Sequence, residues 1–430
     1  MLNKAKELLK QKEKKQIFSN FVSLSVLNAI SFLFPLITVP YLTRVLEPER
    51  FGIVSFALVI MQYFIILTNF GFAFSATQQI SINRENIKKV SEIFSAVICV
   101  KFLFTILCAI ILLVLCSTIE QFRIDKAIFI ASFGIVIGDV LLPLWLFQGM
   151  EKMKFITIVN FASKLLFTLL IFVFVKNQED YLLVPLFTTA GYLLAGIISF
   201  FIAFHTFKLK VVMPDLKTIK EQINASWAIF VSTLSINLYR NANTLLLGLL
   251  TGNYAIVGLY SSAEKIIKGL QSIVSPVSDA LFPYLSRKLS GNDDKSNINY
   301  IIRLGKYYFI ALLPISLILM IFAKPIAIFV LGNKFVAAAT DTRIMSFVIL
   351  FGGMNYFLGI LGLTNMGYKK NFMYYVMITG LISILSLFIF IPLWQDQGAS
   401  FVLLISELLL FCMLISFFIR KKLKYSKQNT

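Results

Sequence analysis

The sequence of 430 residues is poor in charged side chains and almost without histidine. Only 14% of its residues are Asp, Glu, Lys or Arg, and His205 is the single histidine. A water-soluble domain of ordinary composition carries about 25% charged residues, whereas 58% of this chain is apolar. The composition therefore excludes an ordinary soluble globule and predicts an integral membrane protein.

Sequence motifs for catalysis and metal binding are missing as well. The chain has no GxxxxGK[ST] phosphate loop, no HExxH sequence and no nucleophile elbow. Its cysteines lie in apolar runs without CxxC spacing, so we expect neither a disulfide framework nor a metal site; they are Cys99, Cys108, Cys116 and Cys412. We therefore expect no enzyme activity and no cofactor.

Long apolar runs recur along the whole chain, and they predict membrane-spanning helices rather than strands of a β-barrel. The run at 325–331 is too short to cross a hydrocarbon layer of about 30 Å, so we expect it to lie at the membrane interface. The twelve predicted spans are 17–39, 51–75, 93–115, 127–147, 155–175, 181–204, 227–250, 257–282, 307–322, 344–363, 372–393 and 398–419.

The distribution of basic residues predicts the topology. Outside the spans, 27 Lys and Arg residues lie on the side of the two termini and 8 on the other side. The positive-inside rule then places both termini in the cytoplasm. This asymmetry explains most of the net charge of +19, so we expect membrane lipid as the partner of the basic loops, and no nucleic acid.

A weak internal repeat divides the chain in two. Residues 52–57 align with 258–263, and residues 75–81 align with 281–287, about 206 residues further on. Because six spans separate equivalent positions, we expect two parallel six-helix repeats about an axis along the membrane normal. The predicted parts are a cytoplasmic basic tail (1–16), an N-terminal bundle (17–204), a cytoplasmic linker (205–222), a C-terminal bundle (223–419) and a second basic tail (420–430).

One arginine is predicted to lie near the middle of the membrane. Arg240 is 13 residues from Trp227 and 10 from Leu250, which places it roughly 15 to 20 Å from either end of its helix. Exposure to lipid there would cost at least about 2.5 kcal/mol. Asn237 and Asn241 flank it, so the sequence predicts a polar face inside the membrane.

Arg240 has two interpretations. It could form a buried ion pair with Asp139 or Glu407 that fixes helix packing, or it could line a water-filled lumen. We favour the lumen, because cations within the predicted spans exceed acids and cannot all be paired one to one.

Four lysines in the spans complete the set of candidate substrate-binding cations. Lys164 lies near the middle of its span, whereas Lys101 could either line the lumen or extend to the cytoplasm. Glu264 and Lys268 are spaced to neutralise each other on one helix face, which leaves Lys265 less explained. The candidate binding residues are Arg240, Lys164, Lys101, Lys265, Lys268, Asn237 and Asn241.

The acids in the spans are candidates for coupling transport to an ion gradient. Asp139 lies four residues before Pro143, in a span that can therefore bend. Asp139, Glu407 and Glu264 could exchange protons during transport or hold lumen cations in place. We favour the second role, because the cations outnumber the acids.

Several sequence blocks resemble Wzx-type O-antigen flippases, which form the polysaccharide transporter branch of the MOP superfamily together with the MATE exporters. The resemblance covers nearly the whole chain, with one departure: Glu47 stands where the family usually has glycine. The blocks are Pro40-Tyr41-Leu42 with Arg44 and Leu46, Phe51-Gly52, Gly71-Phe72, Ser75-Ala76-Thr77, Trp145-Leu146-Phe147-Gln148-Gly149 with Glu151-Lys152-Met153-Lys154, Ala263-Glu264-Lys265 and Pro283-Tyr284-Leu285-Ser286.

This resemblance implies a V-shaped transporter of twelve helices with a central cationic lumen. It would move a polyprenyl (undecaprenyl) diphosphate-linked oligosaccharide from the cytoplasmic to the periplasmic leaflet of a bacterial inner membrane by alternating access. Polysaccharide polymerase machinery is the implied protein partner. The membrane potential favours outward movement of an anion by about 2.3 kcal/mol per charge per 100 mV, so ATP is not required in principle.

Three other functions compete with this interpretation. A MATE-type drug or metabolite exporter would favour a negatively charged lumen for its usual cationic substrates. The family of lipid II flippases resembles a chain of fourteen spans rather than twelve. A membrane-embedded polysaccharide polymerase or ligase usually displays a large periplasmic loop, which this sequence does not contain.

Overall fold

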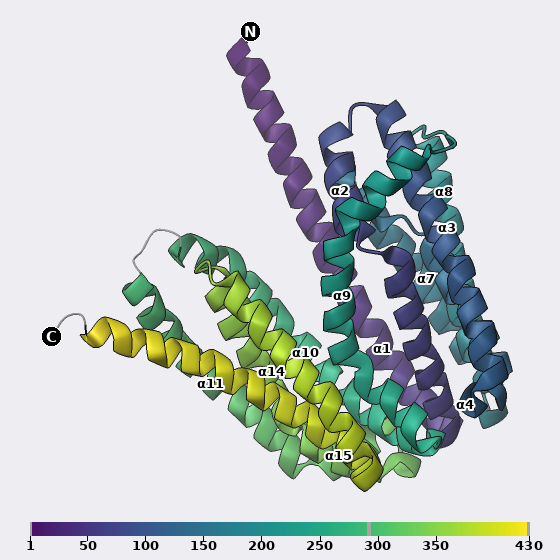
Figure 1. Cartoon of the computed structure of the whole chain (residues 1–430), viewed down its shortest axis with the longest axis vertical. Coiled ribbons are helices and arrows are strands. Elements are labelled where there is room, and N and C mark those ends of the chain that lie inside the picture. Colours follow the sequence, from purple (N-terminus) through teal and green to yellow (C-terminus); the bar gives the residue numbers. More distant parts are fainter. Residues whose placement is uncertain (1, 290–293, 428–430) are drawn as a thin grey trace. The chain divides into compact units, whose positions relative to one another are not determined.

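Most of the described part of the chain is helical. The computed structural model describes residues 2–289 and 294–427. These residues form helices with no β-strand among them, and the connections are short apart from residues 206–215 (Figure 1). The expected all-α fold is thereby confirmed. Each predicted span falls on one or more described helices, and the predicted interfacial segment lies in a helix of nine residues, α12 (Ala323–Leu331).

Long and short helices alternate in the first half of the chain. The helices up to residue 205 are α1 (Leu2–Asn69), α2 (Phe72–Asn83), α3 (Ile87–Thr118), α4 (Glu120–Arg123), α5 (Lys126–Val140), α6 (Leu144–Gly149), α7 (Met153–Phe174), the 3-10 helix η1 (Gln178–Leu182) and α8 (Leu183–His205). Those that follow are α9 (Leu216–Thr251), α10 (Tyr254–Leu289), α11 (Asp294–Ile321), α12, η2 (Asn333–Phe335), α13 (Ala338–Ile344), η3 (Met345–Phe347), α14 (Val348–Asn355), the π-helix η4 (Tyr356–Thr364) and α15 (Lys369–Lys427).

Eight helical stretches in the described ranges are long and apolar enough to cross a membrane. The chain is therefore a multi-pass membrane protein. Two of these stretches contain a break: α1 is interrupted at Glu47 (φ 62°, ψ 167°) and α15 at Gln395 (φ 51°, ψ −124°). Both breaks fall in predicted connections between spans. One continuous helical stretch can therefore contain two membrane crossings, and the number of stretches differs from the number of crossings. The number of twelve crossings stays a prediction.

The backbone of Glu47 is unusual for a residue with a side chain. Its φ and ψ lie in a region that is almost restricted to glycine, and Glu47 is the position at which the sequence departs from the usual glycine of the family it resembles.

The predicted bend near Pro143 is also present: α5 ends at Val140, and α6 begins at Leu144. Asp139 consequently lies in the last turn of α5.

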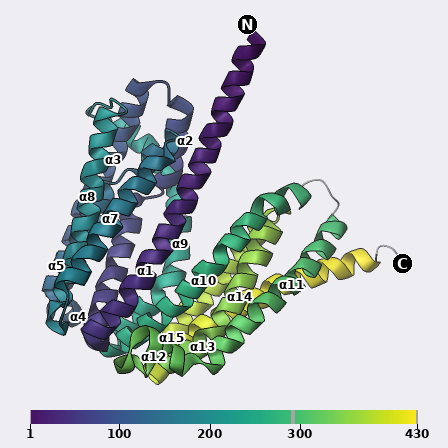
Figure 2. The ribbon, with the colours of Figure 1, turned by 180° about the vertical axis from the view of Figure 1, so that it is seen from behind.

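The chain divides into two compact units, each with its own core. The first unit consists of Met1–Thr38 and Ala57–Leu234, and the second consists of Val39–Phe56 and Ser235–Thr430. In the first unit, α5 packs against α8, and α7 packs against the same helix (Figure 2). Its core is rich in aromatic side chains, among them Phe70, Phe94, Trp145, Phe147, Phe207 and Phe230.

In the second unit, α14 and α15 pack against each other, and both contact α10 and α11 (Figure 1). The buried side chains of its core include Leu285, Ile301, Phe357, Leu361 and Phe418. Residues 39–56 of α1 belong to this unit although the rest of α1 belongs to the first. The predicted boundaries of the two six-helix bundles stay predictions.

Glycines bring residues 39–56 close to α10. A Cβ atom on Gly52 would lie 1.8 Å from the carbonyl oxygen of Tyr254, and one on Gly258 would lie 1.9 Å from that of Pro48. The two glycines that the internal repeat aligns are thus packed against each other's backbone. A side chain at either position would force the segments apart.

Two polar contacts also fix residues 39–56 within the second unit. The guanidinium of Arg44 donates to the carbonyl oxygen of Phe329 at 2.6 Å, near the end of α12. Lys334 forms an ion pair with the strained Glu47. A charged side chain near a helix C-terminus satisfies carbonyl groups that the helix leaves open.

Candidate functional site

A buried ion pair lies in the first unit. Lys101 on α3 is 0% exposed, and its Nζ lies 3.7 Å from Oδ2 of Asp139. The same ammonium donates to the backbone oxygen of Asp139 at 3.2 Å, and Asn69 donates to Oδ2 at 2.9 Å. Lys101 therefore does not extend to the cytoplasm, and its charge is balanced by Asp139.

Lys164 has a different environment in the same unit. Its half-buried ammonium on α7 donates to Oγ of Ser31 on α1 at 2.9 Å. It forms no ion pair with any carboxylate of the described residues. A cation within a membrane helix normally faces a partner or a polar cavity, and the described partner of Lys164 is an uncharged hydroxyl.

The two lysines of α10, Lys265 and Lys268, have different partners: one forms an ion pair, and the other contacts uncharged groups. Lys268 lies 2.9 Å from Glu264, which confirms the predicted pairing on one helix face. Lys265 donates to Oγ of Ser55 at 3.2 Å and lies 4.1 Å from the ring centroid of Phe51. The aromatic face attracts the ammonium, so both interactions of Lys265 are with uncharged groups of residues 39–56.

The side chain of Arg240 lies outside the described residues, although α9 carries the residue. Of its predicted polar neighbours, Asn241 donates to Oδ1 of Asn237 at 3.5 Å. Asn243, also on α9, is buried and donates to the hydroxyl of Tyr260 at 2.7 Å. The substrate-binding role of Arg240, Asn237 and Asn241 stays a prediction.

Glu407 on α15 is held by an amide. Asn355 donates to Oε2 of Glu407 at 2.7 Å and to its backbone oxygen at 2.8 Å. Asn355 is the last residue of α14, directly before the π-helix η4. π-Helical turns occur frequently at functional sites, which makes this part of the second unit a candidate for a moving or ligand-sensitive element.

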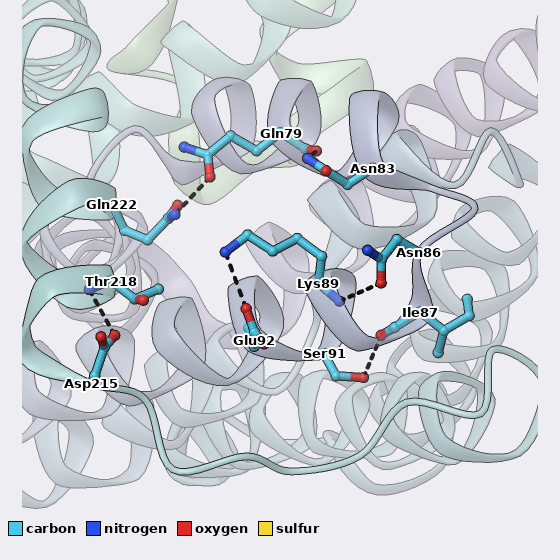
Figure 3. Close-up of polar contacts among 10 residues, drawn as sticks. All are labelled: Gln79, Asn83, Asn86, Ile87, Lys89, Ser91, Glu92, Asp215, Thr218 and Gln222. Atoms are coloured by element: carbon cyan, nitrogen blue, oxygen red, sulfur yellow. Dashed lines mark hydrogen bonds and ion pairs between the residues drawn. The ribbon is translucent and has the colours of Figure 1, made fainter.

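A polar seam joins α2 to the first half of α9 in the first unit. The hydroxyls of Ser75 and Ser226 are 2.6 Å apart. Gln222 donates from Nε2 to Oε1 of Gln79 at 2.7 Å (Figure 3). Near the start of α9, the backbone N–H of Thr218 donates to Asp215 at 2.9 Å. Hydrogen bonds from Thr218 hold the pKa of Asp215 below its usual value.

The sequence-predicted residues are thus brought together only in part. The structure pairs Lys101 with Asp139 and Lys268 with Glu264, while it places Lys164 and Lys265 beside serine hydroxyls. The sequence did not reveal the uncharged partners of these residues, because isolated polar residues in apolar runs are common. These partners are Ser31, Ser55, Asn69 and Asn355. The hydrogen-bonded pair of Gln79 and Gln222 was missed for the same reason.

Comparison with solved structures defines the class of the fold. The chain resembles lipid II flippase MurJ in an inward closed conformation, with a TM-score of 0.69 and 12% identity over 94% of this chain and 90% of that chain. It also resembles an inward-facing multidrug resistance MATE family transporter of the MOP superfamily, with a TM-score of 0.63 and 14% identity over 96% and 100% of the two chains. The fold is that of an all-α membrane transporter.

Sequence comparison defines the family. A family described as polysaccharide biosynthesis protein matches residues 17–289. A protein of Escherichia coli (strain K12) named putative O-antigen transporter is 30% identical over 410 residues, covering 94% of this chain and 97% of the relative. A second protein of that name, from Shigella dysenteriae, is 30% identical over 286 residues, covering 66% of this chain and 71% of the relative.

The chain belongs to this polysaccharide biosynthesis protein family, and the resemblance to Wzx-type flippases is confirmed. Its relatives and structural neighbours are named as transporters or flippases rather than as enzymes. This agrees with the expectation that the chain is not an enzyme.

Proposed function

We propose that this protein is a flippase for a polyprenyl (undecaprenyl) diphosphate-linked oligosaccharide, an O-antigen unit or a similar precursor of a surface polysaccharide. It would carry the glycan from the cytoplasmic to the periplasmic leaflet of a bacterial inner membrane by alternating access. The function is supported by the 30% sequence identity, over 94% of this chain, to a relative named putative O-antigen transporter. Among the structural observations, the environment of Lys164 carries the proposal.

The reason lies in the charge of the substrate. A diphosphate and a chain of sugar hydroxyls cannot enter hydrocarbon without losing their hydrogen bonds to water, which costs many kcal/mol. The ammonium of Lys164 donates a hydrogen bond to one serine hydroxyl and forms no ion pair with a carboxylate in the described part of the chain. Such a group can replace water at a phosphate oxygen without first breaking an ion pair. Lys101 and Lys268 would have to leave Asp139 and Glu264.

Genetic complementation tests the function. The host is a strain that lacks its own O-antigen transporter but still makes the lipid-linked unit. The wild-type chain should restore surface glycan, and the untransported lipid-linked unit should fall. A drug exporter would instead change drug resistance, and a polymerase would change glycan chain length. Failure of the wild-type chain in several strains with different glycans would contradict the function.

Substitution of Lys164 tests the observation that carries the proposal. Lys164→Ala should abolish surface glycan at normal membrane abundance, whereas Lys164→Arg should retain part of it because the charge remains. Lys126→Ala is the matched control, since that lysine is exposed at the start of α5 in the same unit and is not a candidate binding residue. Normal glycan in the alanine variant of Lys164 would remove this residue from the site.

The predicted topology can be tested in the same cells. Reporter tags within 205–222 and after Thr430 should give a cytoplasmic signal, and a tag near Asn253 should give a periplasmic one. A periplasmic signal from the first position would contradict both the twelve crossings and the parallel repeats.

A further inference from the structure

The seam between α2 and α9 has a regular construction. A Cβ atom on Gly71 would lie 2.8 Å from the carbonyl oxygen of Ser226, so the two backbones are in close contact at one end. One turn further along α2, Ser75 meets Ser226, and after another turn Gln79 meets Gln222. The stripe 71, 75, 79 repeats every four residues, which is the spacing of one helix face.

The two flanks of this stripe on α2 differ. Phe72, Ala76 and Ile80 are each 0% exposed in the core of the first unit. On the other flank, Phe74 is 68% exposed and Gln78 is exposed as well. The seam therefore borders a surface that presents an aromatic ring and an amide one turn apart.

The amide pair in the seam has unused hydrogen-bonding capacity. Gln222 is 2% exposed, and its Oε1 accepts no hydrogen bond from the described residues. The side chain of Gln79 acts only as an acceptor there, so its amide N–H groups have no partner within the described part of the chain. Buried polar atoms nearly always find a partner, so a buried acceptor beside an unused donor points to a ligand.

The charges around the pair do not favour an anion. Lys89 and Glu92 on α3, which Figure 3 draws together with Gln222, form an ion pair at 3.1 Å. Lys220 and Glu221 are exposed neighbours of opposite charge in the first turns of α9. A diphosphate would find no excess of positive charge here, in contrast to Lys164.

We propose that Phe74, Gln78, Gln79 and Gln222 form a subsite, the α2–α9 subsite, that binds an uncharged sugar residue of the transported oligosaccharide. This inference rests on the proposed function and adds the recognition of the glycan to it. A sugar hydroxyl both donates and accepts, so one hydroxyl satisfies the acceptor of Gln222 and the donor of Gln79. The apolar C–H face of the ring covers Phe74.

The subsite also predicts selectivity among sugars. A site that hydrogen-bonds a hydroxyl rejects an analogue that lacks it far more strongly than a purely apolar site does, because its polar groups are then left without partners. The diphosphate and the polyprenyl chain are common to all such substrates. The α2–α9 subsite would therefore distinguish one oligosaccharide from another.

Binding is measured directly on the full-length protein in lipid nanodiscs. Saturation-transfer NMR is recorded with a panel of neutral methyl glycosides, and inorganic pyrophosphate is added as a competitor. We expect saturable binding of at least one glycoside that pyrophosphate does not displace. Gln79→Leu should weaken it at least about tenfold, and Gln78→Leu should weaken it less. Gln397→Leu, an exposed glutamine on α15 of the second unit, is the matched control.

The outcomes separate this inference from the proposed function. Absence of glycoside binding, displacement by pyrophosphate, or equal affinity in Gln79→Leu and the control overturns the subsite. If Gln79→Leu fails to fold, the exposed Gln78→Leu variant decides, and unchanged affinity there also overturns it. Complementation of surface glycan by the wild-type chain tests the flippase independently, since it requires no glycoside binding in vitro.

Discussion

The two units hold the acids of their apolar helices in different ways. In the first unit, Asp139 lies beside the ammonium of Lys101, which is fully buried. In the second unit, Glu407 accepts two hydrogen bonds, one to its side chain and one to its backbone, from the amide of Asn355. An ion pair depends on both charges, whereas an amide can donate to a carboxyl group in either protonation state.

This difference changes the roles that the sequence suggested for the two acids. Protonation of Asp139 would leave the Lys101 charge buried without its counter-ion, which is strongly unfavourable. Asp139 is therefore best suited to a constant structural charge. Glu407, next to a π-helical segment, can change its charge with a smaller loss of local interactions.

Removal of the Lys101 charge should have the largest effect. Lys101→Met leaves the carboxylate of Asp139 without its cation, and we expect a loss of about 3 to 5 kcal/mol in the free energy of unfolding. Thermal unfolding of the purified protein and its membrane abundance measure this loss. The double variant Lys101→Met with Asp139→Leu should recover much of it. An unchanged unfolding temperature in the single variant would show that the pair is not important for stability.

A methyl group between the two aligned glycines should have the next largest effect. Gly52→Ala places Cβ against a backbone carbonyl oxygen, which cannot rotate away, so we expect a loss of about 1 to 3 kcal/mol. Gly305→Ala on α11 is the control, because its nearest neighbour is a ring atom of Phe357 at 3.2 Å. Equal unfolding temperatures for the two variants would refute the close contact between residues 39–56 and α10.

Replacement of the strained Glu47 should stabilise the second unit. Glu47→Gly removes backbone strain of about 1 to 3 kcal/mol and loses an ion pair whose lysine side chain is 58% exposed, which contributes at most about 1 kcal/mol. We expect a net gain of about 1 kcal/mol in thermal unfolding. Lys334→Ala, which removes the pair alone, should be slightly destabilising. A lower stability of the glycine variant would mean that the carboxylate contributes more than the strain costs.

Neutralisation of Glu407 should cost less than neutralisation of Asp139. Glu407→Gln keeps an acceptor for Asn355, and that hydrogen bond loses the extra strength of a charged acceptor, about 1 kcal/mol. In reconstituted vesicles we expect substantial transport, with a rate that follows membrane potential more than pH. Asp139→Asn, in contrast, should yield little folded protein. If transport depended on a pH gradient at zero potential and this dependence were lost in Glu407→Gln, Glu407 would be a coupling group.

The smallest effect is expected at the start of α9 in the first unit. The hydrogen bonds from Thr218 lower the pKa of Asp215, so the stabilisation is present above the usual pKa of about 3.9 and is lost as pH falls through the lower folded value. Hydrogen exchange at Thr218, corrected for intrinsic rates, should show less protection in Asp215→Ala at neutral pH. That difference should shrink in acid, and a difference independent of pH would contradict it.

Much of the fold could be predicted from the sequence because long apolar runs leave few alternatives. The helix positions, the bend before Pro143 and the short α12 follow from composition, proline chemistry and length. The strained backbone of Glu47 could not be predicted, since glutamate is unfavourable there. The only indication was that the family usually has glycine at this position.

The candidate site was less predictable because it depends on which helix faces meet. Spacing within one helix was sufficient to pair Glu264 with Lys268, but the partner of Lys101 lies 38 residues away on another helix. An ammonium bonded to a serine looks the same in sequence as one bonded to a carboxylate. Charge counts alone therefore did not reveal that Lys164 and Lys101 differ.

The assignment of residues 39–56 to the second unit has a consequence for biosynthesis. Lys265 donates a hydrogen bond to Ser55, which lies 210 residues earlier in the chain. A nascent chain grows at about 5 to 20 residues per second. The segment would therefore wait roughly 10 to 40 s for α10 to be synthesised. During that time the surface around Gly52 lacks α10, against which it packs in the folded protein. A chaperone or a membrane insertase that shields this segment would protect the nascent chain from aggregation.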